Sequence, residues 1–200
     1  MTSIVLAGGK SLRLGRDKLS EKVGGESLIQ HVLSRLRSIS DRVLIVTAQD
    51  QNIPPFQPDN RIQVVSDLYP GKGSLGGIYT GLSFADRFAC FVTAADMPFL
   101  NIALIQYLMR FSSDFDVVIP KVQGKVEPLH AVYSRNCLAP IKRLIDSDDL
   151  KIIDFFDEVK VRYIKEDEID GFDPEHISFF NVNTQVDLER ARKLIGQGYN

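Results

Sequence analysis

The sequence predicts an α/β fold in which a mostly parallel, Rossmann-like sheet is covered by helices on both faces, so that the molecule has three layers. Short apolar runs of strand length alternate along the chain with segments whose apolar residues recur at helical spacing. Such alternation is typical of parallel sheets whose strands are joined by helical crossovers. The chain has 200 residues, of which 44% are hydrophobic, and this content is sufficient for one buried core.

The first half of the chain shows the clearest alternation. Its expected strands are short continuous apolar runs, the pattern of strands that are buried on both faces. Its first helix carries apolar residues at spacings of three and four, and its second helix follows a glycine-rich turn. In chain order we expect a strand at 3–7, a helix at 28–36, strands at 42–47 and 62–66, a helix at 76–83 and a strand at 89–94.

The second half is less regular. Asn101 is expected to cap a helix that carries apolar residues over 102–109. Thr184 and Asp187 have the spacing of a capping box, which predicts a final helix through Ile195. The other expected elements are strands at 116–120, 127–133 and 159–164 and helices at 137–145 and 151–156. No change of composition marks a boundary, so we expect one domain over residues 1–200.

Composition and charge exclude several classes of protein. The net charge is −2 and the pI is near 5.9, which argues against a broad basic surface for nucleic acid. Cys90 and Cys137 lack C-x-x-C spacing, so both are interpreted as reduced packing residues. No apolar run approaches the roughly 18 residues of a membrane span, and the N-terminus lacks the pattern of a signal peptide. We therefore expect a cytoplasmic protein that binds neither nucleic acid nor membrane.

The most informative segment follows the first expected strand and reads Leu6-Ala7-Gly8-Gly9-Lys10-Ser11-Leu12-Arg13-Leu14-Gly15-Arg16-Asp17-Lys18. Glycines can present successive backbone N–H groups to phosphate oxygens, and four cations within nine residues add positive charge. The segment lacks the first glycine of a Walker A loop and does not read G-x-G-x-x-G. A solvated glycine-rich turn is the alternative, but the cations favour a loop that binds a polyphosphate.

Asp96 lies just beyond the expected strand at 89–94. Because the carboxyl ends of parallel strands meet at one edge of a sheet, we expect Asp96 and the glycine loop to lie at the same edge, where ligands of such sheets bind. A carboxylate at that place can hold Mg²⁺ against phosphate oxygens. Capping the backbone before the Pro98 turn is the alternative role for Asp96.

Two of these segments resemble motifs of the molybdenum cofactor guanylyltransferases. Residues 6–18 are similar to the family signature L-A-G-G-x-S-x-R-M-G-x-D-K, with Leu14 where the family usually has Met, an exchange that preserves apolar volume. Residues 95–99 read Ala-Asp-Met-Pro-Phe, which resembles the family's Cys-Asp-Met-Pro-Phe. Ala95 replaces the Cys and leaves the metal-binding Asp in place.

The resemblance continues through the rest of the chain. Residues 73–78 are similar to the family's Gly-Pro-Leu-Ala-Gly-Ile, with Ser and Gly in place of the Pro and the Ala, and residues 127–133 and 181–184 also resemble family segments. The likeness spans residue 2 to about residue 190. It implies a fold of the nucleotide-diphospho-sugar transferase type, with a nucleotide-binding half at 1–100 and an acceptor-binding half at 101–200.

The resemblance also implies a reaction. GMP would be transferred from GTP to Mo-molybdopterin, giving the molybdopterin guanine dinucleotide cofactor and pyrophosphate, with Mg²⁺ as cofactor. Direct transfer of an oxidation-prone product favours transient contact with molybdopterin-handling proteins and recipient molybdoenzymes. The alternatives are a cytidylyltransferase that acts on the same pterin, a sugar- or polyol-phosphate nucleotidyltransferase, and a nucleotide- or cofactor-binding protein without turnover.

Four residues are candidates for the chemistry. By resemblance Asp96 binds the metal, and Asn183 is a further candidate metal ligand. Arg13 and Lys18 are candidate catalytic cations, and Lys18 is expected to stabilise charge on the α-phosphate. Because an acceptor phosphate is already ionised at neutral pH, the protein must supply alignment and charge neutralisation rather than a general base.

The remaining candidates bind substrates. Thr47 stands where many relatives have Asn, and Asp67 occupies a family position that contacts guanosine, where its carboxylate can accept N–H or ribose O–H groups. His130, Asn181 and Asn183 are candidates for binding the acceptor, although a lone His is more often structural. The full set of candidate nucleotide-binding residues is Leu6, Ala7, Gly8, Gly9, Lys18, Thr47, Asp67, Gly73, Gly77 and Asp96.

Overall fold

The computed structural model describes residues 1–8, 18–49 and 51–199, and for Lys18 it describes the backbone alone. These residues form one large sheet and one small hairpin. The strands of the large sheet, in spatial order, are β10 (Val161–Ile164), β7 (Val117–Val122), β9 (His130–Ser134), β6 (Ala89–Ala94), β1 (Thr2–Leu6), β4 (Arg42–Thr47) and β5 (Ile62–Ser66), and β8 (Lys125–Val126) pairs with β7.

Most neighbouring strands of this sheet are parallel. Strand β1 pairs in parallel with β4 and β6, β4 with β5, and β10 with β7. Strand β9 is antiparallel to both of its neighbours, and β8 is antiparallel to β7. The central strands are apolar and buried on both faces, as expected of strands that carry helices above and below. The prediction of a mostly parallel sheet is therefore confirmed.

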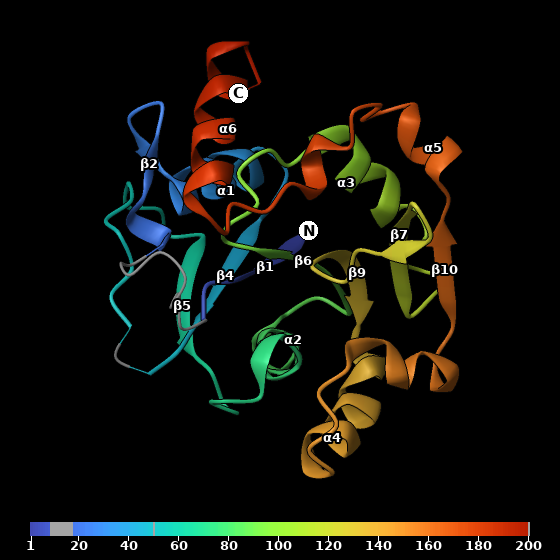
Figure 1. The fold of residues 1–200 in the computed structure, drawn as a ribbon. Coiled ribbons are helices and arrows are strands. Elements are labelled where there is room, and N and C mark those ends of the chain that lie inside the picture. Colours follow the sequence, from blue (N-terminus) through green and yellow to red (C-terminus); the bar gives the residue numbers. More distant parts are fainter. Residues whose placement is uncertain (9–17, 50, 200) are drawn as a thin grey trace.

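Helices cover both faces of the sheet (Figure 1). On one face, α1 (Leu28–Arg37) and α3 (Ile102–Met109) bury their apolar sides in one hydrophobic cluster, which α5 (Glu166–Asp170) joins through Ile169. On the other face, α2 (Gly73–Phe84), α4 (Leu138–Asp146) and the 3-10 helix η3 (Ile152–Glu158) form a second cluster. The molecule thus has the three layers that the alternating sequence pattern predicts.

A third, smaller cluster connects the C-terminal helix α6 (Gln185–Gly196) with the loop after β6 and with the hairpin β2 (Lys22–Val23) and β3 (Glu26–Ser27). The hairpin turns through Gly24 and Gly25, whose φ angles are 60° and 95°, a left-handed conformation that favours glycine. Its strands have two residues each. They are too short for a periodic pattern, and sequence analysis missed them.

The predicted helix caps are confirmed. The Oδ1 atom of Asn101 accepts a hydrogen bond from Leu104 N at 3.0 Å. Thr184 Oγ1 accepts from Asp187 N at 3.2 Å, and Asp187 Oδ2 accepts from Thr184 N at 2.8 Å, which completes the capping box of α6. No helix among the described residues is long and apolar enough to cross a bilayer.

Two predicted starts differ from the structure by about three residues. Strand β9 begins at His130 rather than at 127, because 127–129 form a loop around Pro128, which has no backbone N–H for a sheet. Helix α2 begins at Gly73, one turn before the predicted 76. The short helix predicted over 151–156 is present, as a 3-10 helix over Ile152–Glu158. The remaining short elements are η1 (Lys18–Ser20), η2 (Arg135–Cys137) and η4 (Ile177–Phe179).

Candidate nucleotide-binding site

The carboxyl ends of β1, β4, β5 and β6 meet at one edge of the sheet. Backbone hydrogen bonds continue the pairing just past the strands: Ala7 N donates to Val46 O at 2.8 Å, Ala95 N to Leu6 O at 3.0 Å, and Asp67 N to Thr47 O at 2.8 Å. The residues that follow these strands are therefore held side by side. As predicted, Asp67 and Asp96 both lie at this edge, beside the residues that open the glycine loop.

A cavity of about 460 Å³ opens at this edge between β1, β4 and the first turn of α2. Among the described residues, its walls combine apolar side chains with glycines and one carboxylate, that of Asp67. Six of the candidate nucleotide-binding residues line it, namely Leu6, Gly8, Thr47, Asp67, Gly73 and Gly77, and the other lining residues are Val46, Ala48, Pro70, Gly71 and Ser74. The structure thus gathers residues from three separate segments of the sequence around one space, large enough for part of a nucleotide.

Glycines allow helix α2 to lie close to the cavity. A Cβ atom on Gly77 would lie 3.1 Å from Leu6 Cδ2, and one on Gly76 would lie 2.9 Å from the carbonyl oxygen of Tyr69. Because the first N–H groups of a helix have no partner within the helix, the N-terminus of α2 presents donors and a partial positive charge to this cavity. This end of the cavity suits a carbonyl oxygen of a base or another electron-rich group.

Two polar side chains stabilise the walls of the cavity, and sequence analysis missed both. Gln51 Nε2 donates to Ala7 O at 2.9 Å, and Gln51 Oε1 accepts from Ala48 N at 3.2 Å, so this side chain joins the ends of β1 and β4. Thr80 is fully buried in α2 and donates to Asp67 Oδ1 at 2.8 Å. Neither residue belongs to a recognisable motif. Each one stabilises the cavity by a hydrogen bond to a residue in another segment of the chain, and such a contact leaves no local sequence pattern.

The loop that carries Asp96 is attached to the C-terminal part of the chain. Val182 N donates to Asp96 O at 2.9 Å, which places Asn181 and Asn183 on either side of this contact. A carboxylate and an amide oxygen are ligands that suit Mg²⁺, which takes oxygen donors and fills its other positions with water and phosphate. The residues at this point therefore fit the predicted metal. Among the described residues, no group of three or more His, Cys, Asp or Glu side chains forms an alternative metal site.

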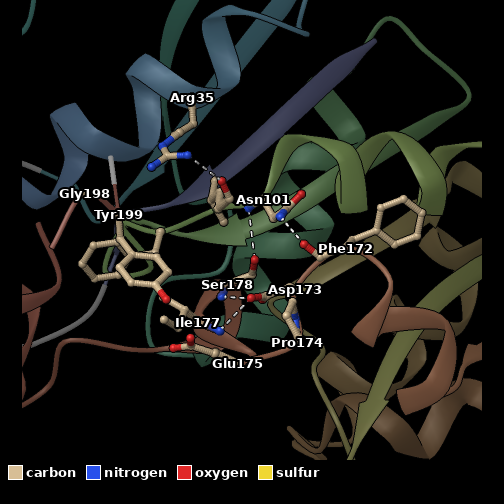
Figure 2. A pocket seen from close by; sticks show the side chains of 12 residues that line it. Arg35, Asn101, Phe172, Asp173, Pro174, Glu175, Ile177, Ser178, Gly198 and Tyr199 are labelled. Carbon is tan, nitrogen blue, oxygen red and sulfur yellow. Dashed lines mark hydrogen bonds between the residues drawn. The ribbon is translucent and has the colours of Figure 1, made fainter.

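The far end of the same loop is held by a second set of contacts, shown in Figure 2. Asn101 N donates to Ser178 Oγ at 3.1 Å and Asn101 Nδ2 donates to Phe172 O at 2.8 Å. Asp173 accepts from Ser178 N at 2.8 Å, and Arg35 Nη1 donates to Leu100 O at 3.3 Å. These residues surround a smaller cavity of about 260 Å³. Segment 172–182 therefore fixes the loop at both ends.

The position of His130 corrects the prediction that it contacts the acceptor. Its ring is fully buried and packs edge-on against Phe91 and Phe179, with centroids 5.0 Å and 4.9 Å apart. Neither ring nitrogen has a hydrogen-bond partner among the described residues, and burial lowers the pKa of His130 to about 3. A neutral ring sealed in the core reaches no ligand. Instead, it supports Phe179, which precedes Asn181 and Asn183.

Several predictions fall on residues that the structure does not describe. Gly9 and Arg13 lie outside the described residues, as does the side chain of Lys18.

Both cysteines are free and buried, as expected for packing residues. Burial raises the pKa of each thiol to about 12, so neither is a reactive thiolate at neutral pH.

Known proteins resemble this chain over nearly its whole length. Residues 3–160 match the family described as the MobA-like NTP transferase domain. The chain is 36% identical over 193 residues to a probable molybdenum cofactor guanylyltransferase of Pelotomaculum thermopropionicum, with 96% of this chain and 92% of that protein covered. It is 36% identical over 200 residues to the molybdenum cofactor guanylyltransferase of Desulfosudis oleivorans, with 99% and 97% covered.

Solved structures give the same result. The molybdopterin-guanine dinucleotide biosynthesis protein A of Archaeoglobus fulgidus superposes with a TM-score of 0.83 at 29% identity, covering 98% of this chain and 100% of that one. The 4-diphosphocytidyl-2C-methyl-D-erythritol synthase of Anaerococcus prevotii superposes with a TM-score of 0.70 at 16% identity, over 98% of this chain and 97% of that one. The latter shows that the fold is shared with other nucleotidyltransferases.

Proposed function

This chain belongs to the MobA-like NTP transferase family, and from this premise we propose that it transfers GMP from GTP to Mo-molybdopterin with the help of Mg²⁺. The products are molybdopterin guanine dinucleotide and pyrophosphate. Relatives named molybdenum cofactor guanylyltransferase match nearly the whole chain. We assign the nucleotide to residues 1–100 and the acceptor to residues 101–200 of a single domain.

One observation of the structure supports the proposal most directly, namely the cavity at the carboxyl edge of the sheet. It is bordered by Asp67, by the N-terminus of α2 and by Gly8, where the glycine loop begins. Guanosine in this cavity would have its triphosphate near Gly8, where the glycine loop begins, and the cations that follow in the sequence would suit that charge. The backbone of Leu6, Ala7, Gly8 and Gly9 and the charges of Arg13 and Lys18 are proposed to bind that triphosphate.

The reaction needs charge neutralisation more than proton transfer. A phosphate oxygen of the acceptor attacks the α-phosphorus of GTP, a new P–O bond forms, and the bond to the bridging oxygen of pyrophosphate breaks. Both reactants are anions, so cations are required to bring them together. Mg²⁺ held by Asp96, with Asn183 as a second candidate ligand, would supply positive charge between the phosphates. Lys18 is proposed to stabilise the charge that develops on the α-phosphate.

The acceptor is proposed to bind next to the Asp96 loop. Asn181 and Asn183 flank the hydrogen bond between Val182 and Asp96, so a phosphate in contact with these amides would lie near the metal. Transient contact with molybdopterin-handling proteins and with recipient molybdoenzymes remains a proposal that follows from the sensitivity of the product to oxidation.

The decisive experiment supplies the purified protein with Mg²⁺, Mo-molybdopterin and one of GTP, CTP or ATP. Of the three nucleotides, we expect only GTP to give pyrophosphate release and the dinucleotide product. Preference for CTP would make the protein a cytidylyltransferase acting on the same pterin. If the protein instead used a sugar or polyol phosphate as acceptor in the absence of pterin, it would be a sugar- or polyol-phosphate nucleotidyltransferase. Binding of GTP without pyrophosphate release would overturn the proposed activity.

A further inference from the structure

The hydroxyl of Thr80 donates a hydrogen bond to the carboxylate of Asp67, which lines the cavity at the carboxyl edge of the sheet. We propose that Thr80 is a positioning residue for nucleotide recognition, because it fixes Asp67 with one carboxylate oxygen held by the protein and the other left for the ligand. The inference rests on the proposed function, since it requires Asp67 to contact the donor nucleoside. Thr80 itself does not line the cavity.

The direction of each hydrogen bond follows from the groups involved. Leu68 N donates to Thr80 Oγ1 at 3.0 Å, and Thr80 Oγ1 lies 2.8 Å from Asp67 Oδ1. A backbone N–H cannot accept, and an ionised carboxylate cannot donate. The proton of the Thr80 hydroxyl must therefore point at Asp67. Because the hydroxyl is fully buried, water does not compete for this bond.

The two oxygens of the Asp67 carboxylate differ in their hydrogen bonds to the protein. Tyr69 N also donates to Asp67 Oδ1, at 3.0 Å, so this one oxygen accepts two hydrogen bonds and its two lone pairs are occupied. Within the described residues, Asp67 Oδ2 accepts no hydrogen bond from the protein. Since Asp67 lines the cavity, Oδ2 is the atom available to an N–H or O–H donor of a nucleoside.

Thr80 also connects Asp67 to helix α2, which forms part of the cavity wall. Gly73 and Gly77 of the same helix line the cavity, and Tyr79 packs edge-on against Tyr69 with ring centroids 5.1 Å apart. The hydroxyl thus sets where the carboxylate stands relative to the N-terminus of α2. Both groups would contact one bound nucleoside, so an error in their spacing would reduce its affinity.

The test measures the affinity for GTP and the values of KM and kcat for Thr80→Val, Asp67→Asn and the double variant. Valine has nearly the shape of threonine but lacks the donor, so we expect Kd and KM for GTP to rise about tenfold, as for loss of a hydrogen bond to a charged group, with a much smaller change in kcat. Thr80→Ser retains the hydroxyl and should restore the wild-type affinity. In the Asp67→Asn background, Thr80→Val should have little further effect.

Controls separate positioning from folding. Ser83 lies on the same helix, and its hydroxyl donates to Tyr79 O at 2.8 Å, so Ser83→Ala should leave the affinity for GTP unchanged. Melting temperature and circular dichroism are measured for every variant. If Thr80→Val does not fold, Thr80→Ala replaces it in the same cycle, and the comparison with Thr80→Ser is kept.

The outcomes distinguish this inference from the proposed function. Wild-type affinity for GTP in the valine variant, or an equal loss of affinity on Thr80→Val in the wild-type and the Asp67→Asn backgrounds, would overturn the role of Thr80 while GTP remains the donor. A wild-type protein that does not bind GTP would overturn the proposed donor instead. Inosine triphosphate and 2′-deoxy-GTP identify the group that Oδ2 accepts: the analogue without that group should bind wild type and Thr80→Val with similar affinity.

Discussion

Two loops at the same edge of the sheet are held in different ways. In the segment 67–77, which forms a wall of the cavity, the Asp67 side chain is held from nearby in the sequence, because Thr80 reaches it across 13 residues. The loop 95–101, which carries Asp96, is held by partners far along the chain. Phe172 and Ser178 bond to Asn101 across 71 and 77 residues, and Val182 bonds to Asp96.

From this difference we predict which steps of the proposed reaction depend on each half of the chain. The cavity proposed for the nucleoside is built almost entirely by the first half of the chain. The proposed metal loop belongs to the first half as well, but its position depends on the second half, which also carries the candidate acceptor residues. Changes in segment 172–183 are therefore expected to affect the metal and the acceptor together, and to leave recognition of the nucleoside intact.

The largest expected effect separates the two loops directly. Asp96→Ala removes the proposed metal ligand, and we expect transfer to fall by about a thousandfold or more, because the metal supplies several kcal/mol of charge stabilisation. Affinity for GTP measured without metal should remain close to wild type, since the cavity is untouched. Pyrophosphate release and calorimetry measure the two quantities. Normal turnover in this variant would remove Asp96 from the metal site.

The second prediction perturbs the cavity instead. A Cβ on Gly77 would lie 3.1 Å from Leu6 Cδ2, so Gly77→Val should crowd the cavity and raise KM for GTP by about tenfold to a hundredfold, consistent with overpacking of about 1–3 kcal/mol. The Mg²⁺ concentration that gives half the maximal rate should not change. Gly196→Val is the control, because no atom lies within 4 Å of a Cβ there. An altered Mg²⁺ requirement in Gly77→Val would mean that the two loops are not independent.

The third prediction perturbs the attachment of the Asp96 loop. Asn101→Ala loses both the helix cap to Leu104 N and the bond to Phe172 O, which should lower the free energy of unfolding by about 1–2 kcal/mol. We expect a higher Mg²⁺ requirement and an unchanged KM for GTP. The control is Asn136→Ala, which loses a 2.7 Å bond to Asp116 Oδ1 at the opposite edge of the sheet. A rise in KM without any change in the Mg²⁺ requirement would contradict the comparison.

The same contrast explains how much of the molecule could be predicted. Apolar periodicity and caps are local signals, so the layers of the sheet and the caps at Asn101 and Thr184 were predictable from short windows. Leu6, Thr47, Asp67 and Gly77 were predicted to bind one nucleotide from their resemblance to family motifs, and parallel strands explain why the first three lie at one edge of the sheet. These inferences depend on a pattern within a single element, on a family motif or on the general geometry of α/β sheets.

What could not be predicted depends on pairs of distant residues. Nothing in the sequence near Asp96 indicates that Val182 bonds to its carbonyl oxygen, and nothing near His130 indicates that Phe179 covers its ring. Thr80 lies in a largely apolar helix, where a hydroxyl has no periodic signal of its own. Such contacts depend on how distant loops pack against each other in the folded protein. A short sequence motif contains no information about that packing.

The smallest expected effect concerns the packing that supports the second-half segment. His130 is neutral in the folded protein because its pKa is lowered to about 3, whereas in the unfolded chain its pKa is about 6.5. Below pH 6.5 the unfolded chain therefore binds a proton that the folded protein does not, so stability falls as the pH falls. At pH 6 this contribution amounts to about 1 kcal/mol relative to pH 8. Chemical unfolding at both values measures it.

His130→Leu removes the titrating group while retaining an apolar contact to Phe91 and Phe179. The variant should lose about 1 kcal/mol less stability than wild type between pH 8 and pH 6. His31→Gln is the control for removal of a histidine that is not sealed between aromatic rings, because His31 Nε2 is hydrogen-bonded to Val23 O at 2.8 Å. If His130→Leu followed wild type, the His130 ring would be protonated in the folded protein. The apolar support of Phe179, which precedes Asn181 and Asn183, would then need another explanation.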